Sequence, residues 1–494
     1  MKKGLLSLLF FMSLTISAAT IYVKPVATGT GAGTSWANAS NLQDAIMACT
    51  SADEIWVMAG THLPTYGTGR GKGFYIYGGT KKIYGGFNGT ETLLSQRNPK
   101  LNSTILSGDI SANDNTNLIP TEATRQDNSY HIITVIHQAS GTSYITIDGF
   151  TLSGGNANGT TLTSGAGQYF HSRGGALYVQ SRYSGDFMSV QMNNCVFEKN
   201  TGTDVSVSSG YFNNGQVSKT IITDFTNCVF RFNYATTNGT VLISGANGYT
   251  WYGNSKIENC LFNNNTSVNG ASCLYLSASE VNSGNQNSIS AVVINSTFSN
   301  NSGLSGQTIR SHNASNCAFK NVIIYNNGGN APFNFTGTLG GPSLQNTISQ
   351  GGQIGGIDSN PLLNSDFTLQ ATSSAINAGN NGFITSGITQ DLNGNARIVN
   401  TTVDMGAYEY NATLGNHDFE TIADFKAYPN PTKGFLTLSS ASKVESVAVY
   451  TLLGNKVKTF DTVQIDLSDL SAGVYLLQVK TENGQQSLKK IVKE

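Results

Sequence analysis

Charge is scarce in this sequence. Only 12% of its 494 residues are charged, and 28 Lys and Arg against 29 Asp and Glu leave a net charge of −1. Proteins that bind nucleic acids usually concentrate positive charge, so we expect no nucleic-acid partner. A disordered chain would usually carry more charge and fewer aromatic residues than the 10% found here, so the composition favours a folded protein.

Long hydrophobic runs are also scarce. After residue 19, no stretch approaches the ~20 apolar residues that a membrane-spanning helix needs. The first residues differ, because Lys2 and Lys3 precede an apolar segment from Leu5 to Ile16, and small residues follow. This pattern predicts a secretory signal peptide over residues 1–19. We therefore expect an exported chain with no transmembrane segment after signal removal.

What the sequence has in abundance is one repeated phrase. Its four copies are Asn194-Cys195-Val196-Phe197-Glu198-Lys199-Asn200, Asn227-Cys228-Val229-Phe230-Arg231-Phe232-Asn233, Asn259-Cys260-Leu261-Phe262-Asn263-Asn264-Asn265 and Asn295-Ser296-Thr297-Phe298-Ser299-Asn300-Asn301. The copies begin 33, 32 and 36 residues apart, and such a period is typical of a solenoid. Cys (or Ser) and Phe are two residues apart, so both point to the same side of a strand.

These properties predict an all-β fold, a right-handed parallel β-helix in which each turn of the coil lies ~4.8 Å above the last. Equivalent Cys, Phe and Asn residues should then form columns. We expect the final Asn of each copy to adopt the φ > 0 of a turn, which Asn tolerates. The run Tyr144 to Leu152 fits one turn earlier if Phe150 takes the Cys195 position and Leu152 the Phe197 position.

The chain has six cysteines, which in an exported protein suggest disulfides. In a parallel stack, however, the Cβ vectors of Cys195, Cys228 and Cys260 run side by side and do not converge. We therefore expect buried thiols here, and a straight column does not suit a tetrahedral zinc site. Cys317, in Ser315-Asn316-Cys317-Ala318-Phe319, looks like a further copy that lacks its final Asn.

A second set of strands is expected between the copies, near residues 176–179, 204–207, 240–243, 272–276 and 307–310. A loop follows each strand, and because stacked turns force stacked loops, these loops should form one surface, the loop wall. Its aromatic and charged residues suit stacking against sugar rings or contact with a protein partner. The alternative is that they fold back over their own loops. The candidate ligand-binding residues are Arg182, Tyr183, Asp186, Tyr211, Phe212, Tyr249, Trp251, Tyr252 and Glu280.

Two further groups of residues have alternative interpretations. His171 and Arg173 could belong to a site on another edge of the coil or have structural roles. Asp391, Asn393 and Asn395 alternate like the ligands of a calcium loop, but Gly394 is misplaced for an EF-hand. The alternative there is a turn with Asx hydrogen bonds. No other metal or cofactor is indicated by the sequence.

The chain divides into a large and a small domain. Residues 20–359 should form the β-helix, with an N-terminal capping helix near Leu42 to Met47 that begins after Ser40 or Asn41. Residues 360–410, called the closing segment below, should cap the C-terminal turn of the coil. A linker over 411–424 leads to residues 425–494, where nine Lys and no Arg occur. Short strand patterns separated by turns predict a small Ig-like antiparallel β-sandwich there.

Both domains resemble known families. The pattern Phe-x-x-Asn, with Gly174-Gly175-Ala176-Leu177, is similar to the repeats of chlamydial polymorphic outer membrane proteins and of other pectin-lyase-like β-helix proteins. This resemblance implies the fold and says little about chemistry, because the architecture hosts adhesins, lyases and glycosidases alike.

The small domain closely resembles the type A C-terminal sorting domain of type IX secretion. The resemblance rests on Tyr428-Pro429-Asn430-Pro431, Leu470-Ser471-Ala472-Gly473-Val474-Tyr475 and the ending Lys489-Lys490-Ile491-Val492-Lys493. It implies that residues 425–494 contact the type IX secretion machinery and that the protein passes through the periplasm to the outer cell surface or the medium. An ordinary adhesive sandwich module is the alternative.

Motifs of known catalysts on this fold are missing. The chain has no Asp-Asp pair, no His-Gly and no Arg-Ile-Lys, as polygalacturonases have, and no Arg-x-Pro-x-x-Arg of pectate lyases. Between residues 151 and 330 the carboxylates stand singly, whereas glycosidases need facing pairs. We therefore favour a non-catalytic, adhesin-like protein that binds polysaccharide or a surface partner. The alternative is a divergent polysaccharide lyase or related carbohydrate-active enzyme, for which calcium would be an expected cofactor.

Overall fold

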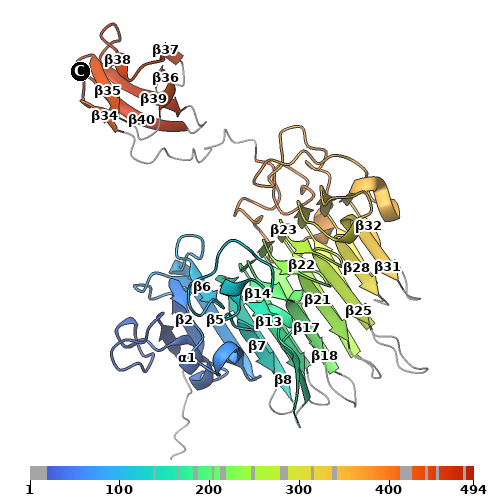
Figure 1. Cartoon of the computed structure of the whole chain (residues 1–494). Helices are drawn as coiled ribbons and strands as arrows, with labels where there is room; N and C mark the ends of the chain where they lie inside the picture. The colour runs from blue at the N-terminus through green and yellow to red at the C-terminus, as the bar shows by residue number, and fades with distance from the viewer. Residues whose placement is uncertain are drawn as a thin grey trace, which may run out of the picture. The chain divides into compact units, whose positions relative to one another are not determined.

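A computed structural model shows how the chain folds (Figure 1). It describes residues 19–136, 141–164, 167–181, 187–202, 205–211, 219–245, 251–278, 288–312, 316–336, 342–411, 426–439, 443–451, 456–481 and 486–494. The predicted signal peptide therefore lies almost wholly outside the described residues. The chain forms two compact units, Met1–Asn411 and Ala412–Glu494.

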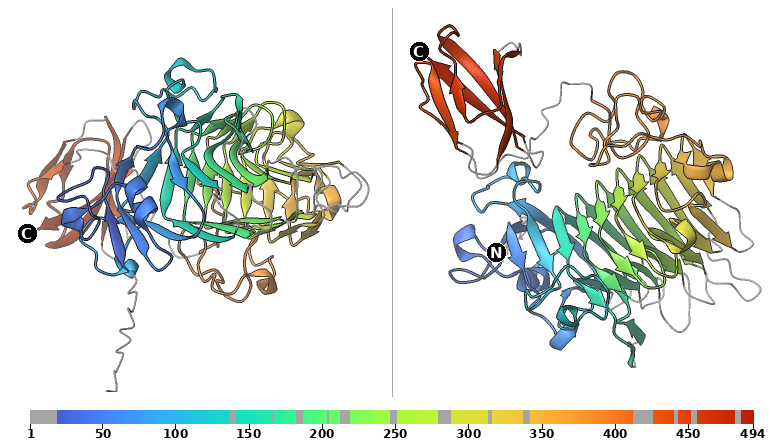
Figure 2. Two further views of the ribbon diagram at one scale, coloured as in Figure 1. Left: turned by 90° about the horizontal axis from the view of Figure 1, so that it is seen from below. Right: turned by 45° about the horizontal axis from the view of Figure 1, so that its top comes forward.

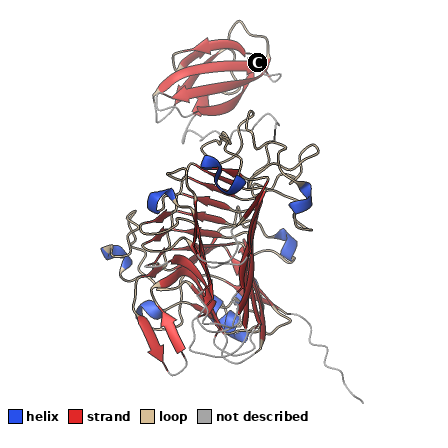
Figure 3. Ribbon diagram, turned by 90° about the vertical axis from the view of Figure 1, so that its right-hand side faces the viewer, coloured by secondary structure: helices blue, strands red, loops and turns tan. Residues whose placement is uncertain are grey.

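The first unit is a parallel β-helix, as predicted. Its described strands form three long parallel sheets in which each strand pairs with its equivalent one turn away. Figure 2 shows the strands as rows of arrows that run in the same direction, and Figure 3 shows that the helical segments are short and lie outside the stacked strands.

Sheet 1 consists, in spatial order, of β1 (Thr20–Val23), β2 (Glu54–Met58), β5 (Thr80–Phe87), β8 (Thr142–Asp148), β14 (Phe187–Asn193), β18 (Lys219–Thr226), β22 (Trp251–Glu258), β26 (Ser288–Ile294), β29 (Asn316–Lys320) and β32 (Ser343–Gln345). Sheet 2 consists of β3 (Gly60–His62), β6 (Thr104–Ser107), β9 (Phe150–Ser153), β15 (Val196–Glu198), β19 (Val229–Arg231), β23 (Leu261–Asn263), β27 (Thr297–Ser299), β30 (Ile323–Tyr325) and β33 (Ile348–Ser349).

Sheet 3 consists of β4 (Phe74–Ile76), β7 (Ile133–Ile136), β13 (Arg173–Ser181), β17 (Val205–Tyr211), β21 (Val241–Gly245), β25 (Leu274–Ala278), β28 (Ile309–His312) and β31 (Phe333–Thr336). Short strands at a corner form sheet 4: β10 (Asn156–Ala157), β16 (Thr201–Gly202), β20 (Tyr234–Ala235) and β24 (Thr266–Ser267). An antiparallel hairpin joins β11 (Thr161–Ser164) and β12 (Gly167–Phe170). The helical segments are α1 (Leu42–Ala48), η1 (Trp36–Asn38), η2 (Gly69–Gly71), η3 (Leu94–Gln96), η4 (Ala123–Arg125), η5 (Leu304–Gly306), η6 (Gln350–Gly355) and η7 (Asn381–Phe383).

The repeated Phe residues form one internal column, as predicted. Phe197, Phe230, Phe262 and Phe298 are fully buried and stack face to face, with ring centroids 4.6, 4.3 and 4.5 Å apart. Leu152 pairs with Phe197 and so continues the column one turn earlier, which confirms the expected alignment. Stacked aromatic pairs stabilise a core by about 0.5–1.5 kcal/mol beyond their area burial.

The final Asn residues form a buried amide ladder. Asn233 shows the pattern: its Nδ2 donates to the Phe197 carbonyl oxygen (2.8 Å) and to Asn265 Oδ1 (3.0 Å), and its Oδ1 accepts from Asn200 N (3.1 Å). Asn200, Asn265, Asn301 and Asn327 make equivalent bonds. Each amide thereby satisfies the backbone at a corner of the coil, where the strand pairing is interrupted.

The predicted φ > 0 at the final Asn is wrong. Positive φ occurs instead at the first Asn of each copy, with φ of 51° at Asn194 and 55° at Asn227, and at the residue before the final Asn, with φ of 55° at Lys199 and 54° at Phe232. The final Asn is used for its side-chain amide, whereas the first Asn is used for its tolerance of the left-handed region.

The cysteines are all described, buried and free, as expected for the column of Cys195, Cys228 and Cys260. Burial raises the pKa of the Cys195 and Cys228 thiols far above the ordinary value, so these thiols are unreactive. The next position in the column is Ser296, whose Oγ donates to the Ile294 carbonyl oxygen (2.7 Å).

The expected position of Cys317 is wrong. Cys317 pairs with Ala291 and lies in sheet 1, not in the cysteine column. The true fifth copy is Asn321-Val322-Ile323-Ile324-Tyr325-Asn326-Asn327, in which Ile324 pairs with Phe298 and Asn327 ends the amide ladder. Sequence inspection missed it because Val and Ile replace Cys and Phe.

Helix α1 begins after Asn41, whose side chain accepts from Asp44 N, and it buries Leu42, Ala45 and Ile46 in the main core. It covers the first turns of the coil, as predicted.

The same helix protects an exposed sheet edge, because Gln43 exchanges two hydrogen bonds with the backbone of Tyr75 in the edge strand β4 (3.2 and 2.9 Å).

The closing segment does not simply cap the last turn. Leu369, Ala375 and Met405 pack on Ile323 and Ile348 of the last strands of sheet 2. Other parts run back along the outer face of this sheet, where Phe367 and Tyr408 pack against Leu261 and Val229. The segment finally reaches Lys100, whose Nζ donates to the Asn393 carbonyl oxygen (2.7 Å). The predicted cap is therefore a lateral cover, because outward apolar residues of sheet 2 need burial.

The second unit is an antiparallel β-sandwich, as predicted. One sheet holds β34 (Lys426–Tyr428), β35 (Phe435–Ser439) and β38 (Gln464–Asp466); the other holds β37 (Lys456–Phe460), β36 (Val444–Thr451), β39 (Gly473–Thr481) and β40 (Gln486–Lys493). Residues from both sheets, including Leu436, Val447, Leu477 and Ile491, form its buried core.

The amide ladder gives a first prediction. Asn233→Ala should lower the free energy of unfolding by about 3 kcal/mol, because buried backbone and side-chain partners on both neighbouring turns lose their hydrogen bonds. Denaturant titration of the mature chain measures this. Gln191→Ala, which removes an exposed amide from the adjacent sheet, is the control and should change the stability by less than about 0.5 kcal/mol. Equal effects of the two substitutions would contradict the proposed role of the ladder.

Candidate ligand-binding groove

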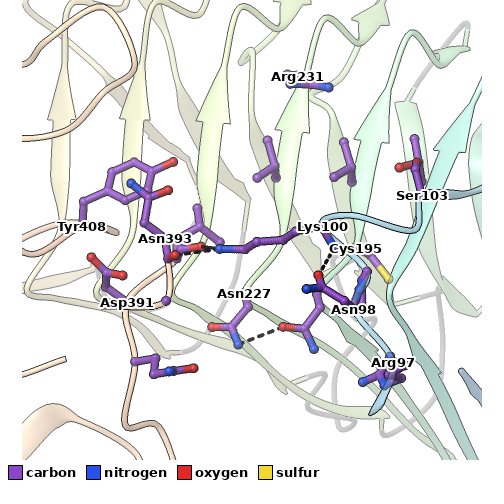
Figure 4. Close-up of a pocket in the computed structure, with 18 of the residues that line it drawn as sticks. Arg97, Asn98, Lys100, Ser103, Cys195, Asn227, Arg231, Asp391, Asn393 and Tyr408 are labelled. Atoms are coloured by element: carbon purple, nitrogen blue, oxygen red, sulfur yellow. Dashed lines mark hydrogen bonds between the residues drawn. The ribbon is translucent and has the colours of Figure 1, made fainter. Parts of the chain in front are cut away.

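A groove with a volume of about 730 Å³ lies on the outside of the β-helix (Figure 4). One bank is the stretch from Leu94 to Ser103, which includes η3, and the other is formed by residues 390–394 and Tyr408 of the closing segment. The floor is the outer face of sheet 2 with the turns that precede its strands. We call this site the lateral groove. Its volume falls within the range of about 300–1,000 Å³ that is usual for ligand sites.

The floor carries a second amide ladder, made by the first Asn of each phrase. Asn227 Nδ2 donates to Asn194 Oδ1 (3.2 Å), and Asn259 Nδ2 donates to Asn227 Oδ1 (2.9 Å). Asn194 in turn donates to Asp148 Oδ1 (2.8 Å), and Asn259 Oδ1 accepts from Arg397 Nη1 (2.7 Å). The ladder therefore runs between an anchored carboxylate and an anchored guanidinium.

This outer ladder retains hydrogen-bonding capacity. A primary amide has two N–H donors and two acceptor lone pairs, and the ladder uses one of each at Asn227. Asn194 is exposed and Asn227 is half-buried, so both can be reached from the groove. The floor thus offers donors and acceptors from two consecutive turns, together with the apolar side chains of Val196 and Val229.

Three cations line the groove. Arg231, whose side chain is 45% exposed, donates from Nε to Glu198 Oε2 (2.8 Å). Lys100 Nζ reaches across to the carbonyl oxygens of Asn393 (2.7 Å) and Leu392 (3.3 Å), as Figure 4 shows. Arg97 pairs with Asp148 (2.8 Å). Arg231 and Lys100 retain unused N–H donors, because a guanidinium has five and an ammonium three.

The second bank is held by a buried ion pair. Arg397 and Glu409 are both almost fully buried and in contact, and Arg397 also donates to the carbonyl oxygens of Gly406 (3.1 Å) and Ala407 (3.2 Å). Burial raises the pKa of Glu409 to about 7, against the opposing effect of Arg397. Because Arg397 also binds Asn259 of the floor, this pair fixes the closing segment on the ladder.

The possible calcium loop is a tight turn closed by the Asp391 side chain, but it is not the predicted Asx turn, because the backbone donor lies four residues on and not two. Asp391 is buried; its Oδ1 accepts from Asn395 N (2.8 Å), and its Oδ2 accepts from Asn395 Nδ2 (3.1 Å) and Glu409 N (2.9 Å). These bonds engage both carboxylate oxygens in shaping the bank of the groove. Within the described ranges, no group of three or more His, Cys, Asp or Glu side chains is arranged to hold a metal ion. Calcium binding here stays a prediction.

Most residues of the predicted loop wall cannot be placed. Arg182, Tyr183, Asp186, Phe212, Tyr249 and Glu280 lie outside the described residues. Tyr211 ends β17, and Trp251 and Tyr252 begin β22; their backbone is described and their side chains are not. Ser181 pairs with Tyr211 and Lys219 pairs with Trp251, so the strand ends that flank successive loops are in register, and the loop wall itself stays a prediction.

His171 and Arg173 are separate from the groove. The His171 ring stacks on Tyr130, with centroids 4.4 Å apart, and lies 5.6 Å from His131. Burial, together with nearby Arg70, lowers the pKa of His171. The Arg173 guanidinium lies 5.0 Å from the centre of the Phe170 ring. These contacts favour the structural interpretation.

Of the groove residues, sequence inspection singled out only Asp391 and Asn393, as part of a possible calcium loop. Arg97, Lys100, Arg231 and Tyr408 come from three distant stretches of chain, and nothing in the sequence brings them together. The one available signal was the first Asn of each phrase. Its position just before the inward Cys places it at the outer turn, where Asn194 and Asn227 reach the groove, whereas Asn259 and Asn295 are buried.

Comparison with known proteins identifies the second unit. Residues 426–494 match the family model of the secretion system C-terminal sorting domain, so the second unit is a type IX secretion sorting domain and implies export to the cell surface or the medium. Among curated proteins, none matches the sequence. Among solved structures, the chain is similar to the crystal structure of pectate lyase Pel9A, with 14% sequence identity and a TM-score of 0.31. The alignment covers 80% of this chain and 97% of the pectate lyase chain.

These findings define the class of protein: a parallel β-helix that is exported with a C-terminal sorting domain. In the part of the chain that the structure describes, no helix is both long and apolar enough to span a bilayer.

The Arg397–Glu409 pair gives a second prediction. Arg397→Leu should destabilise the docked closing segment by about 3–5 kcal/mol at neutral pH, because it leaves Glu409 buried without a partner. Since the folded-state pKa of Glu409 is raised from 4.5 to about 7, this group favours folding below pH 4.5 and loses that contribution as the pH rises through 7. Without Arg397 the pKa of Glu409 rises further, so the defect should grow with pH beyond the part that comes from the lost hydrogen bonds of Arg397, which is present at every pH.

Thermal unfolding of the mature chain at several pH values measures this effect. The matched control is Arg397→Leu combined with Glu409→Gln, in which the pH dependence that Glu409 adds should disappear, because this carboxylate is gone while Asp391 and Asp404 are present in both variants. A defect of the single variant that is equal at all pH values would contradict the role assigned to the pair.

Proposed function

We propose that the protein is carried by its sorting domain through the periplasm and the outer membrane to the cell surface or the medium, where the β-helix binds a polysaccharide or a surface partner in an adhesin-like role. The observation that carries the proposal is the lateral groove, whose floor repeats the same amide at two consecutive turns, Asn194 and Asn227. A polymer with a regular repeat is the ligand that best matches donors and acceptors at regular spacing.

The groove lining favours a polysaccharide with acidic groups. Arg231 and Lys100 offer positive charge, and Asp391, the carboxylate among the described lining residues, is engaged by backbone and side-chain N–H groups. Sugar hydroxyls suit the amides of Asn194 and Asn227, and apolar sugar faces suit Val196 and Val229.

The loop wall remains a second proposed surface, with Trp251 as its most promising contact.

A lyase activity is the second candidate function. The observation in its favour is Lys100 in a cationic groove, since removal of the proton α to a uronate carboxyl needs a base such as Lys or Arg. Incubation of the mature chain with acidic polysaccharides, followed by ultraviolet absorbance of unsaturated products, separates the two functions. Product formation that Lys100→Gln abolishes would establish the lyase; binding without product would establish the adhesin-like role.

Export gives a third prediction. Deletion of residues 426–494 should leave the β-helix inside the cell envelope, because the segment that matches the sorting domain is lost. Cell fractionation and immunodetection of the full-length and truncated chains measure this, with a periplasmic protein as the marker. Surface exposure or release of the truncated chain at the normal level would contradict the proposal.

The groove gives a fourth prediction. Arg231→Gln should weaken binding of polygalacturonate or alginate by about fivefold, the loss of roughly 1 kcal/mol from an exposed charged contact. Asn227→Gly should weaken it too, because Gly keeps the φ of 55° and removes only the amide. Titration calorimetry measures both affinities.

Lys82→Gln is the matched control, since Lys82 is an exposed cation of sheet 1 outside the groove, and it should bind as the unmodified chain does. A further variant, Trp251→Ala, tests the loop wall in the same assay. Unchanged affinity in Arg231→Gln and Asn227→Gly, with a loss in Trp251→Ala, would move the site from the groove to the wall.

A further inference from the structure

Sheet 3 carries a polar cluster on its outer face at three consecutive strands, β25, β28 and β31. The strand register aligns Tyr275, Arg310 and Asn334 in one outward row, and Ser277, His312 and Thr336 in the next. The alternating residues Leu274, Ile309 and Phe333 are buried in the core, so the rows between them face outward. The lateral groove, by contrast, lies over sheet 2.

Arg310 is the central residue of this cluster. Its guanidinium carbon lies 4.8 Å from the centre of the Tyr275 ring. Its Nε is buried and has no hydrogen-bond partner, and no ion pair joins the guanidinium to a carboxylate among the described residues. The sequences of the three strands, LYLSA, IRSH and FNFT, contain no Asp or Glu.

The neighbouring polar side chains are held in place. Asn334 Nδ2 donates to Gln307 Oε1 (2.9 Å), which leaves the second N–H of this amide as a donor beside Arg310. His312 Nδ1 and Thr336 Oγ1 are 2.9 Å apart in the adjacent row. The cluster therefore surrounds one half-buried cation with hydrogen-bonding groups of fixed orientation.

This arrangement suits a planar anion. The Arg310 guanidinium carbon lies over the Tyr275 ring, and Nε is buried, so the terminal N–H groups are the ones that a ligand would meet. A half-buried cation without a counter-ion is unfavourable, and a ligand carboxylate would supply both the opposite charge and two acceptors matched to the guanidinium fork. Lys, a compact point charge, could not make the same paired contact.

The geometry points to a second binding site: Arg310, stacked on Tyr275 and flanked by Asn334, binds the carboxylate of an acidic saccharide. The ligand class rests on the proposed polysaccharide binding, whereas the location and the anionic chemistry rest on this cluster alone. The site lies on a different sheet from the groove, so one exported chain would hold an acidic polymer at two places.

Titration calorimetry with trigalacturonate tests the site, because a short probe reports each site separately. The unmodified mature chain should bind two molecules, and Arg310→Gln should bind one, with the affinity at the lost site reduced roughly 10- to 100-fold. Arg310→Lys should retain weak binding there, since it keeps the charge and loses the fork. Arg231→Gln should affect the other site and leave this one intact.

The outcomes separate the two proposals. If Arg310→Gln still binds two molecules of the probe with unchanged affinity, the Arg310 site is wrong. If Arg231→Gln still binds two molecules with unchanged affinity, the groove is wrong. The trimethyl ester of the probe provides a test on the unmodified chain and should fail to bind at the Arg310 site. Equal binding of the ester, or binding there of a sulfated trisaccharide in place of trigalacturonate, would overturn the carboxylate assignment.

Discussion

The structure depends on the register of parallel strands. Once backbone hydrogen bonds fix each strand above its equivalent, a side chain meets its own counterparts in the turns before and after it. For Phe197 and Phe230 this gives stacked rings with centroids 4.6 Å apart. For Asn233 and Asn265 it gives a hydrogen bond of 3.0 Å between the two side-chain amides. A column of identical residues is favourable only while every member is in register, so the repeated phrase selects one coil over its slipped alternatives.

The two Asn columns show how one residue type meets two different needs. The inner column at Asn200, Asn233 and Asn265 is fully buried and satisfies backbone groups at a corner, where a chain without it would leave polar atoms unpaired in the core. The outer column at Asn194 and Asn227 adopts positive φ and keeps half of its hydrogen-bonding capacity towards solvent. The same repetition that stabilises the coil therefore places a regular row of polar groups at its surface.

This difference also explains how far the sequence predicts the structure. The Phe and Cys columns, the capping helix and the small sandwich follow from periodicity and turn residues, and all are present. The phrase does not reveal which of its two Asn residues carries the unusual backbone, and it hides the fifth copy, where Val322 and Ile324 replace Cys and Phe after a step of 26 residues. The closing segment has no period, so its path back along sheet 2 to Lys100 depends on contacts that no local pattern encodes.

The candidate sites lie where the periodic coil meets less regular structure. The lateral groove exists because the closing segment buries Leu261 and packs against Val229 but stops at Lys100, leaving the earlier part of the same face open between two banks. Arg310 stands where an outward row of sheet 3 changes from the buried Leu242 to half-buried polar residues. In both places the columns supply rigid positions, while single departures from the repeat supply the charge. Such a division allows the coil to tolerate changes in its charged residues without loss of the fold, because the columns that hold it together lie elsewhere in each turn.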